Sequence, residues 1–216
     1  MKRIIVICMA LFTLSFAGFA QSDAKSKAIL DKVSAKYRSL DAMKANFTFT
    51  LTNPKIKLNE VQKGTLITRA KANKYQVNLG GTQIVSDGKV VWTYLKSDNE
   101  VQISNVDLSS DAVNPAKIFT LYEKGYKSKY VGVKTIGGKQ KEVIELFPLK
   151  AGAAITKLTL HVDAKTNTIS NAIINEKTGN IYTYAVSGFE PNVKVSDAAF
   201  NFNTKSYPGI EVVDLR

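Results

Sequence analysis

The chain has 216 residues, of which 30 are Lys or Arg and 18 are Asp or Glu, giving a formal net charge of +12. This length is enough for one β domain with its own hydrophobic core. The chain has one histidine and one cysteine, which excludes the Cys/His clusters of zinc and redox sites.

The N-terminus has the pattern of a cleavable export signal. Lys2 and Arg3 form a basic start, an apolar run covers residues 4–17, and small residues precede Gln21. The apolar run is too short to span a membrane comfortably. The sequence therefore predicts export from the cytoplasm.

We expect cleavage after Ala20, so that residues 1–20 are a signal peptide and residues 21–216 form a single domain. The only cysteine, Cys8, lies in the predicted signal, so the mature domain has no disulfide. A basic cytoplasmic protein would suggest a nucleic-acid partner, but export argues against one. An exported basic protein fits anionic lipid surfaces or acidic protein partners, and a merely solvated lysine-rich surface is the alternative.

The mature sequence begins with a predicted helix that runs to about Leu40, capped by Ser22-Asp23. Its apolar residues recur at helical spacing, at Ile29, Val33, Tyr37 and Leu40. About ten or eleven strands follow, in a meander of hairpins that forms a strongly curved sheet. We expect them at residues 47–52, 61–68, 74–79, 84–95 (a hairpin), 101–103, 126–133, 142–147, 155–162, 168–175 and 181–186.

The hairpin at residues 84–95 is the strongest local signal. Asp87-Gly88 predicts a type I′ turn, in which both central residues take positive φ. Both faces of the flanking strands are apolar, so the hairpin is covered on both sides or lines a cavity. Alternation does not decide which face points inward. We choose the face of Trp92 and Tyr94 over that of Val91, because Tyr94 has a polar tip suited to a cavity mouth.

A short helix near residues 115–123 interrupts the strands, with Pro115 at its start and Gly125 after its end. It is unusually apolar for its length, which predicts an insertion that folds back over the sheet as a lid. The apolar residues of this segment are Ile118, Phe119, Leu121 and Tyr122.

Catalytic patterns are missing from the sequence. His161 lies in a predicted strand and points away from that strand's apolar face, and no Asp/Glu cluster has the spacing of a metal site. We therefore expect no metal, no cofactor and no enzymatic activity, and favour the binding of an apolar ligand. An exported enzyme that acts on lipid or glycan with paired carboxylates stays an open alternative.

Several segments resemble the outer-membrane lipoprotein carrier family, LolA. The resemblance covers nearly all of the mature chain and is most specific over residues 44–125. The segments that carry it are KGTLIT (63–68), KYQVNL (74–79), IVSDGKVVWTYL (84–95), NPAKIFTLYEKG (114–125) and SYPGIEVVDLR (206–216).

The resemblance implies an incomplete, highly curved antiparallel β-barrel covered by a helical lid, with an apolar hollow between them. It implies a periplasmic carrier that binds the acyl chains of lipoproteins and moves them from the inner to the outer membrane. Its partners would be acylated lipoproteins, an inner-membrane lipoprotein-releasing ABC transporter and an unidentified outer-membrane acceptor, and the carrier would be a monomer. A related fold that senses mislocalised lipid or lipoprotein and signals to a membrane partner is the alternative.

Arg69 is the best match to the arginine that the LolA family often has, followed by proline, after its KGTLIT-like strand. In the family that arginine is thought to tie the barrel to backbone carbonyls of the lid. Here Ala70 stands in place of the proline. Arginine suits such a latch because its planar fork can hold several carbonyls, where lysine offers a point charge. A surface arginine at a strand end is the alternative.

Strand alternation and the lid together give the predicted lipid-binding cavity. Its wall comes from the first strand and from the strands that flank the Asp87-Gly88 turn, and its roof comes from the lid. The predicted cavity residues are Phe47, Phe49, Leu51, Tyr75, Val77, Trp92, Tyr94, Ile118, Phe119, Leu121 and Tyr122.

Overall fold

The structure, a computed structural model, describes residues 17–107 and 119–216, without the side chains of residues 17–22 and Leu121. Within these ranges the chain forms one α-helix, α1 (Ala17–Ser39), and a 12-stranded sheet. The strands are β1 (Met43–Asn53), β2 (Leu58–Arg69), β3 (Lys74–Leu79), β4 (Thr82–Asp87), β5 (Val90–Leu95), β6 (Glu100–Asn105), β7 (Tyr126–Ile136), β8 (Lys139–Pro148), β9 (Ile155–Asp163), β10 (Thr168–Glu176), β11 (Ile181–Pro191) and β12 (Glu211–Asp214).

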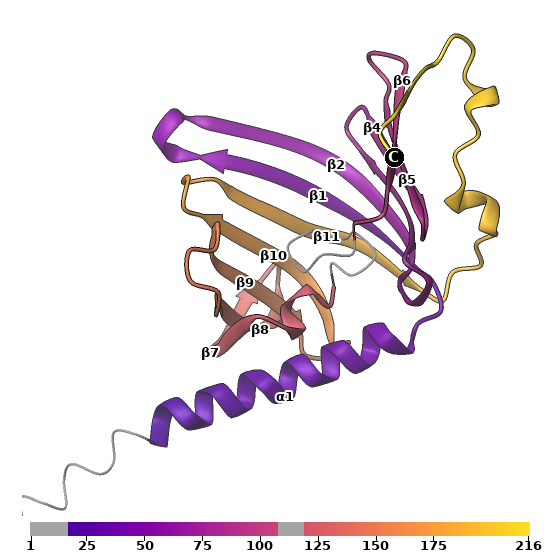
Figure 1. The fold of residues 1–216 in the computed structure, drawn as a ribbon. Coiled ribbons are helices and arrows are strands. Elements are labelled where there is room, and N and C mark those ends of the chain that lie inside the picture. Colours follow the sequence, from indigo (N-terminus) through magenta and orange to yellow (C-terminus); the bar gives the residue numbers. More distant parts are fainter. Residues whose placement is uncertain (1–16, 108–118) are drawn as a thin grey trace, which may run out of the picture.

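The strand order is β12-β6-β5-β4-β3-β2-β1-β11-β10-β9-β8-β7. Most neighbouring strands in this order are consecutive in the sequence and are joined by hairpin turns. The long-range antiparallel pair β1–β11 joins the N-terminal strands β1–β6 to the strands β7–β11. β7 and β12 lie at opposite ends of this order and do not pair, so the barrel stays open. Figure 1 shows the sheet bending sharply between β2 and β4, with α1 crossing beneath the strands. The predicted fold class, mainly β and an incomplete curved barrel with a helical cover, is confirmed.

α1 covers the inner face of the sheet with the predicted apolar stripe. Val33 is fully buried, and Leu30, Tyr37 and Leu40 are nearly so. Between them and the sheet lies the main hydrophobic cluster, which includes Leu66 of β2 and Leu160 of β9. The inner face is therefore the apolar surface around which the domain is built.

The C-terminal segment, residues 192–216, covers part of the outer face, and its strand was missed from the sequence. It contains two short 3-10 helices, η5 (Asp197–Phe200) and η6 (Thr204–Ser206). It ends in β12, which pairs in parallel with β6. Figure 1 shows the segment running alongside β4, β5 and β6.

The turn between β4 and β5 is present but is not of type I′. Only Gly88 takes a positive φ, of 97°. Asp87 instead uses its side chain: Oδ1 accepts hydrogen bonds from the backbone N–H groups of Lys89 and Val90, each at 2.8 Å. Such Asx turns are a common alternative for an Asp that begins a tight turn.

The start of the first helix differs from the prediction, and the start of the predicted lid helix lies outside the described residues. α1 is already helical at Ala17, where the described residues begin, and so across the expected cleavage point at Ala20. The first four residues of the predicted lid helix, 115–118, lie outside the described residues. Its described end is a single 3-10 turn, η4 (Leu121–Glu123).

Candidate functional site

The inner face carries the predicted wall residues of the first and third strands. Tyr75 and Val77 on β3 are buried in the main cluster, at 5% and 9% exposure, and Phe47 on β1 packs against it. Cross-strand partners in an antiparallel sheet lie on the same face, so the register Phe47–Gly64, Leu66–Val77 and Thr68–Tyr75 links the strands into one surface.

A row of half-buried apolar residues continues the same face along β1 and β11. Phe49 pairs with Tyr184 and Leu51 with Tyr182. The Phe49 ring lies 5.2 Å from that of Tyr184 and 6.2 Å from that of Tyr182, between ring centroids. We call these four residues the β1–β11 row; they leave apolar surface accessible beyond the helix-covered cluster.

The placement predicted for Trp92 and Tyr94 is wrong. Both lie on the outer face, packed with Val85 and Val101 in a second cluster. The C-terminal segment covers them: the Tyr94 ring lies 5.6 Å from the Phe202 ring and 4.6 Å from the Tyr207 ring, between centroids.

The pairing register explains this reversal. Val91 pairs with Ser86, which pairs with Tyr75 on the inner face, whereas Trp92 pairs with Val85 on the outer face. Val91 is accordingly the residue that packs against the inner cluster. Both faces of β5 are apolar because each is covered by a different part of the chain.

The described part of the predicted lid faces the sheet. Phe119 and Tyr122 are buried, at 7% and 4% exposure. Phe119 stacks on Tyr37 of α1, with ring centroids 4.6 Å apart and an interplanar angle of 15°. The side chains of Ile118 and Leu121 lie outside the described residues. α1 and the Phe119–Tyr122 segment therefore form one roof over the inner face.

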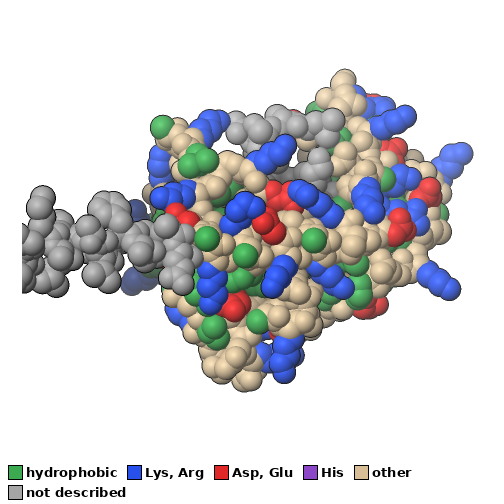
Figure 2. Space-filling model, turned by 90° about the horizontal axis from the view of Figure 1, so that it is seen from below, with side chains coloured by type: hydrophobic (Ala, Val, Ile, Leu, Met, Phe, Trp, Pro, Cys, Tyr) green, Lys and Arg blue, Asp and Glu red, His purple; other side chains and the backbone are tan. Residues whose placement is uncertain are grey.

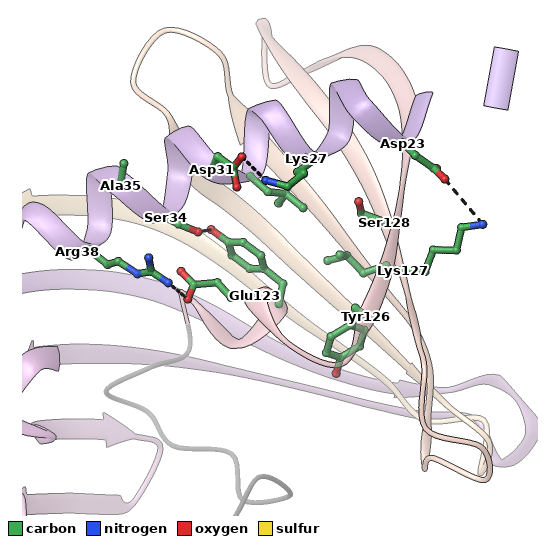
Figure 3. Close-up of a pocket in the computed structure, with 13 residues that line it drawn as sticks. Asp23, Lys27, Asp31, Ser34, Ala35, Arg38, Glu123, Tyr126, Lys127 and Ser128 are labelled. Carbon is green, nitrogen blue, oxygen red and sulfur yellow. Dashed lines mark hydrogen bonds and ion pairs between the residues drawn. The ribbon is translucent and has the colours of Figure 1, made fainter. Parts of the chain in front are cut away.

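A cleft of about 720 Å³ opens at the edge of this roof, between α1, η4 and β7. Its lining includes Leu30, Tyr126 and Leu146, which belong to or pack against the inner cluster. Figure 3 shows charged side chains around it, in three ion pairs that come from α1 and the facing segments. The pairs are Lys27–Asp31 at 2.7 Å, Lys127–Asp23 at 3.8 Å, and Arg38–Glu123.

Hydroxyl groups also join α1 to the segments that face it. Ser34 Oγ and Tyr122 Oη share a buried hydrogen bond of 3.1 Å, and Ser26 Oγ and Ser128 Oγ share one of 2.7 Å. The backbone N–H of Ile169 donates to Tyr37 Oη at 3.0 Å. These few polar contacts supplement the apolar packing that holds the roof.

The titratable groups near the roof are not arranged for acid–base chemistry. Burial raises the pKa of Tyr37, and raises that of Tyr122 to about 12, so both phenols are neutral at neutral pH. His161 lies away from the inner face, opposite Val143 on β8. Its burial lowers its pKa, and Lys134 and Lys141 lower it further, so it is neutral as well.

The described part of the chain contains no group of three or more His, Cys, Asp or Glu residues that could hold a metal ion. No helix within the same residues has the length and apolar composition needed to cross a membrane. Seen from the α1 side, Lys and Arg side chains are spread over the surface with single apolar side chains between them (Figure 2).

A comparison with known protein families matches residues 38–203 to the family described as outer membrane lipoprotein carrier protein LolA. The chain belongs to the LolA family. Two relatives named outer-membrane lipoprotein carrier protein support this. The Haemophilus influenzae protein is 28% identical over 220 residues, covering 100% of this chain and 99% of its own. The Shewanella sediminis protein is 25% identical over 193 residues, covering 87% and 85%.

Solved structures share the fold of this LolA-family chain at lower identity. An uncharacterized conserved protein from Thermus thermophilus has a TM-score of 0.55 and 14% identity, covering 88% of this chain and 99% of its own. Lipoprotein LppX from Mycobacterium tuberculosis has a TM-score of 0.52 and 16% identity, covering 81% and 99%. Both likenesses concern the fold alone.

Arg69, the predicted LolA-type latch, binds the C-terminal segment. Its Nη2 donates to the Val195 carbonyl at 2.6 Å, and its Nη1 pairs with Asp197 of η5. Its Nε lies 4.0 Å from Asp41 Oδ2, just after α1, and its guanidinium lies 5.8 Å from the Phe200 ring centroid. The expected carbonyl contact exists, but in the loop before η5. Contacts with residues 115–118 of the predicted lid lie outside the described residues.

Proposed function

We propose that the protein is a periplasmic carrier that binds the acyl chains of lipoproteins against the inner face of its sheet and moves them from the inner to the outer membrane. The observation that carries the proposal is the inner face itself. A continuous apolar surface runs from the roofed cluster into the half-exposed β1–β11 row. LolA membership and the names of the relatives support lipoproteins as the cargo.

Binding requires that the roof yield to the acyl chains. Phe119 occupies the space between Tyr37 and the sheet, with its ring centroid 6.4 Å from that of Phe189 on β11. An acyl chain that displaces Phe119 would replace one apolar contact with another. The exchange keeps the net gain modest, which suits a carrier that must also release its cargo.

The location and partners belong to the same proposal. Residues 1–20 act as a cleaved export signal, and residues 21–216 work as one monomeric domain without a cofactor. An inner-membrane lipoprotein-releasing ABC transporter supplies the cargo, and an outer-membrane acceptor receives it. LolA membership and the names of the relatives support a carrier and not an enzyme.

Mass spectrometry of ligands that co-purify with the exported protein tests the proposal. We expect acylated polypeptide on the wild-type protein and its loss in Phe49→Glu, which places a charge in the β1–β11 row. Thr50→Glu is the matched control, because Thr50 is the next residue on β1 and pairs with Thr183 on the outer face.

The other outcomes refute the carrier. Free lipid in place of acylated polypeptide favours a lipid sensor. Turnover of lipid or glycan without retained ligand favours an enzyme. Equal retention of acylated polypeptide by Phe49→Glu and Thr50→Glu excludes the inner face as its site.

A further inference from the structure

Three turns lie side by side along one end of the sheet: residues 54–57 between β1 and β2, 177–180 between β10 and β11, and 149–154 between β8 and β9. Figure 1 shows them lined up at the left. Hydrogen bonds join neighbours: Asn53 Nδ2 donates to Asn180 Oδ1 at 2.8 Å, and the backbone N–H of Lys177 donates to the Ala154 carbonyl at 3.0 Å. We call these three turns the turn rim.

The turn rim is basic and has apolar tips. Its sequences, PKIK, LKAGAA and KTGN, contain four lysines and no acidic residue. All four lysines are exposed. Ile56 and Leu149 are each 69% exposed, the highest values among the large apolar side chains of the described residues.

The opposite end of the sheet carries both charges, because its turns hold four exposed lysines, Lys71, Lys89, Lys139 and Lys165, beside acidic residues. The turns and segments there carry Asp87, Asp163 and Asp197, together with Asp41 after α1. Arg69 and Lys74 pair with Asp197, and Lys141 pairs with Asp163. The turn rim therefore differs from the opposite end in having no acidic residue within residues 54–57, 149–154 and 177–180, and not in its number of lysines.

We propose that the turn rim docks on an anionic lipid bilayer, with Ile56 and Leu149 entering the interface and the four lysines facing the headgroups. Lysines near an anionic membrane surface each favour binding, and single apolar side chains add to it by leaving water. An acidic protein is a poorer fit, because protein interfaces are depleted of lysine and use a contiguous apolar centre. On the turn rim, Ile56 and Leu149 stand on separate turns.

This inference goes beyond the proposed carrier function and does not depend on it. If the protein is a carrier, docking has a use: the β1–β11 row ends at this rim, where Leu51 pairs with Tyr182, the second residue of β11. A docked rim would bring the accessible end of the inner face against the lipid surface. The vesicle test below needs no lipoprotein, so its failure leaves the carrier proposal standing.

The test is flotation of the exported protein with vesicles of phosphatidylethanolamine and phosphatidylglycerol, and with vesicles of phosphatidylcholine alone. We expect binding to the anionic vesicles only, weakened by added salt. Lys55→Gln/Lys57→Gln should weaken binding about fivefold for each lysine removed. The control Lys134→Gln/Lys139→Gln removes two exposed lysines from β7 and β8, away from the rim, and should bind like wild type.

A fluorescent label locates the contact. With the only native cysteine removed by Cys8→Ser, an environment-sensitive dye on Ile56→Cys should shift to the blue with anionic vesicles. The same dye on Val133→Cys, a 52% exposed position on β7, should not shift. Equal loss of binding in the two lysine pairs, equal shifts at the two labels, binding to phosphatidylcholine alone, or no vesicle binding each overturns the proposal.

Discussion

The hydrogen bond between Ser34 and Tyr122 offers a direct test of how α1 and the Phe119–Tyr122 segment are held together. It joins two nearly buried residues, at 8% and 4% exposure, whose oxygens lie 3.1 Å apart. Removing one partner leaves the other hydroxyl without its bond. Removing both, as in Ser34→Ala/Tyr122→Phe, leaves no orphaned group. The effects of the two single substitutions should therefore not add.

The magnitude follows from the surroundings. A buried hydroxyl left unsatisfied costs about 1–3 kcal/mol. Both residues also line the cleft, so water can reach a lost partner's position, and Ser34 can bond to a carbonyl in the preceding turn of α1. We expect each single substitution to lower the free energy of unfolding by about 1 kcal/mol, and the double substitution by about the same amount and not twice as much.

Urea unfolding of the four proteins measures this coupling, and Ser39→Ala, on the exposed last turn of α1, is the control. Thermal unfolding should show losses of about 2–4 °C for each single variant. If the roof opens at this contact, uptake of an acylated peptide should become about fivefold faster, the factor that corresponds to about 1 kcal/mol. Additive losses within about 0.3 kcal/mol would refute the reasoning.

Three further predictions concern the outer face and the turns. Arg69→Leu should release the C-terminal segment and shift the fluorescence emission of Trp92 to the red, and Arg69→Lys should cause a smaller red shift. Adding acylated peptide to the wild-type protein should leave the Trp92 emission unchanged. A blue shift of the emission with peptide would contradict the placement of Trp92 on the outer face. Gly88→Ala should lower the free energy of unfolding, measured by urea unfolding, by at least about 2 kcal/mol, because the new Cβ would lie 2.4 Å from the Ala72 carbonyl oxygen. The control Gly81→Ala places its Cβ where no atom lies within 4 Å, so it should be neutral or stabilising. Lys141 holds the pKa of Asp163 at about 2, below its usual 3.8, so this stabilisation is present above about pH 4 and lost as the pH falls toward 2. After allowance for solvent screening, Asp163→Asn should cost about 1 kcal/mol at pH 7 and only a small part of that at pH 2, where about half of the carboxyls are protonated in the folded state; equal costs at both pH values would be the contrary result.

Strand positions could be predicted because apolar and polar residues alternate cleanly in most of them. The span of β3 is the one predicted, and the other predicted strands lie within or close to those in the structure. β12 was missed because the C-terminal segment has short, irregular elements and no period long enough to detect. The LolA family itself could be identified from motifs in the first half of the sequence.

The site could be predicted only in part, because alternation sorts residues into two sets without saying which set faces inward. On β1 only one set is apolar, which predicted Phe47, Phe49 and Leu51 as a single face. On β5 both sets are apolar, and only the pairing with β4 shows that Val91 and not Trp92 faces the inner cluster. The partner of Arg69 could not be predicted from the sequence for another reason: Val195 lies 126 residues further along the chain, and no local pattern connects the two residues.

The pairing of β1 with β11 governs how this domain can fold. Met43 pairs with Pro191, so the centre of the sheet cannot close until most of the chain is available. β6 gains its second partner later still, because that partner, β12, ends two residues before the C-terminus. Sheets built on such distant contacts fold slowly and expose strand edges while they do so. A chain that emerges N-terminus first can pair β1 with β2 and β6 with β5 early. The other edges of β1 and β6 stay exposed until β11 and β12 are available, when the chain most needs protection from aggregation.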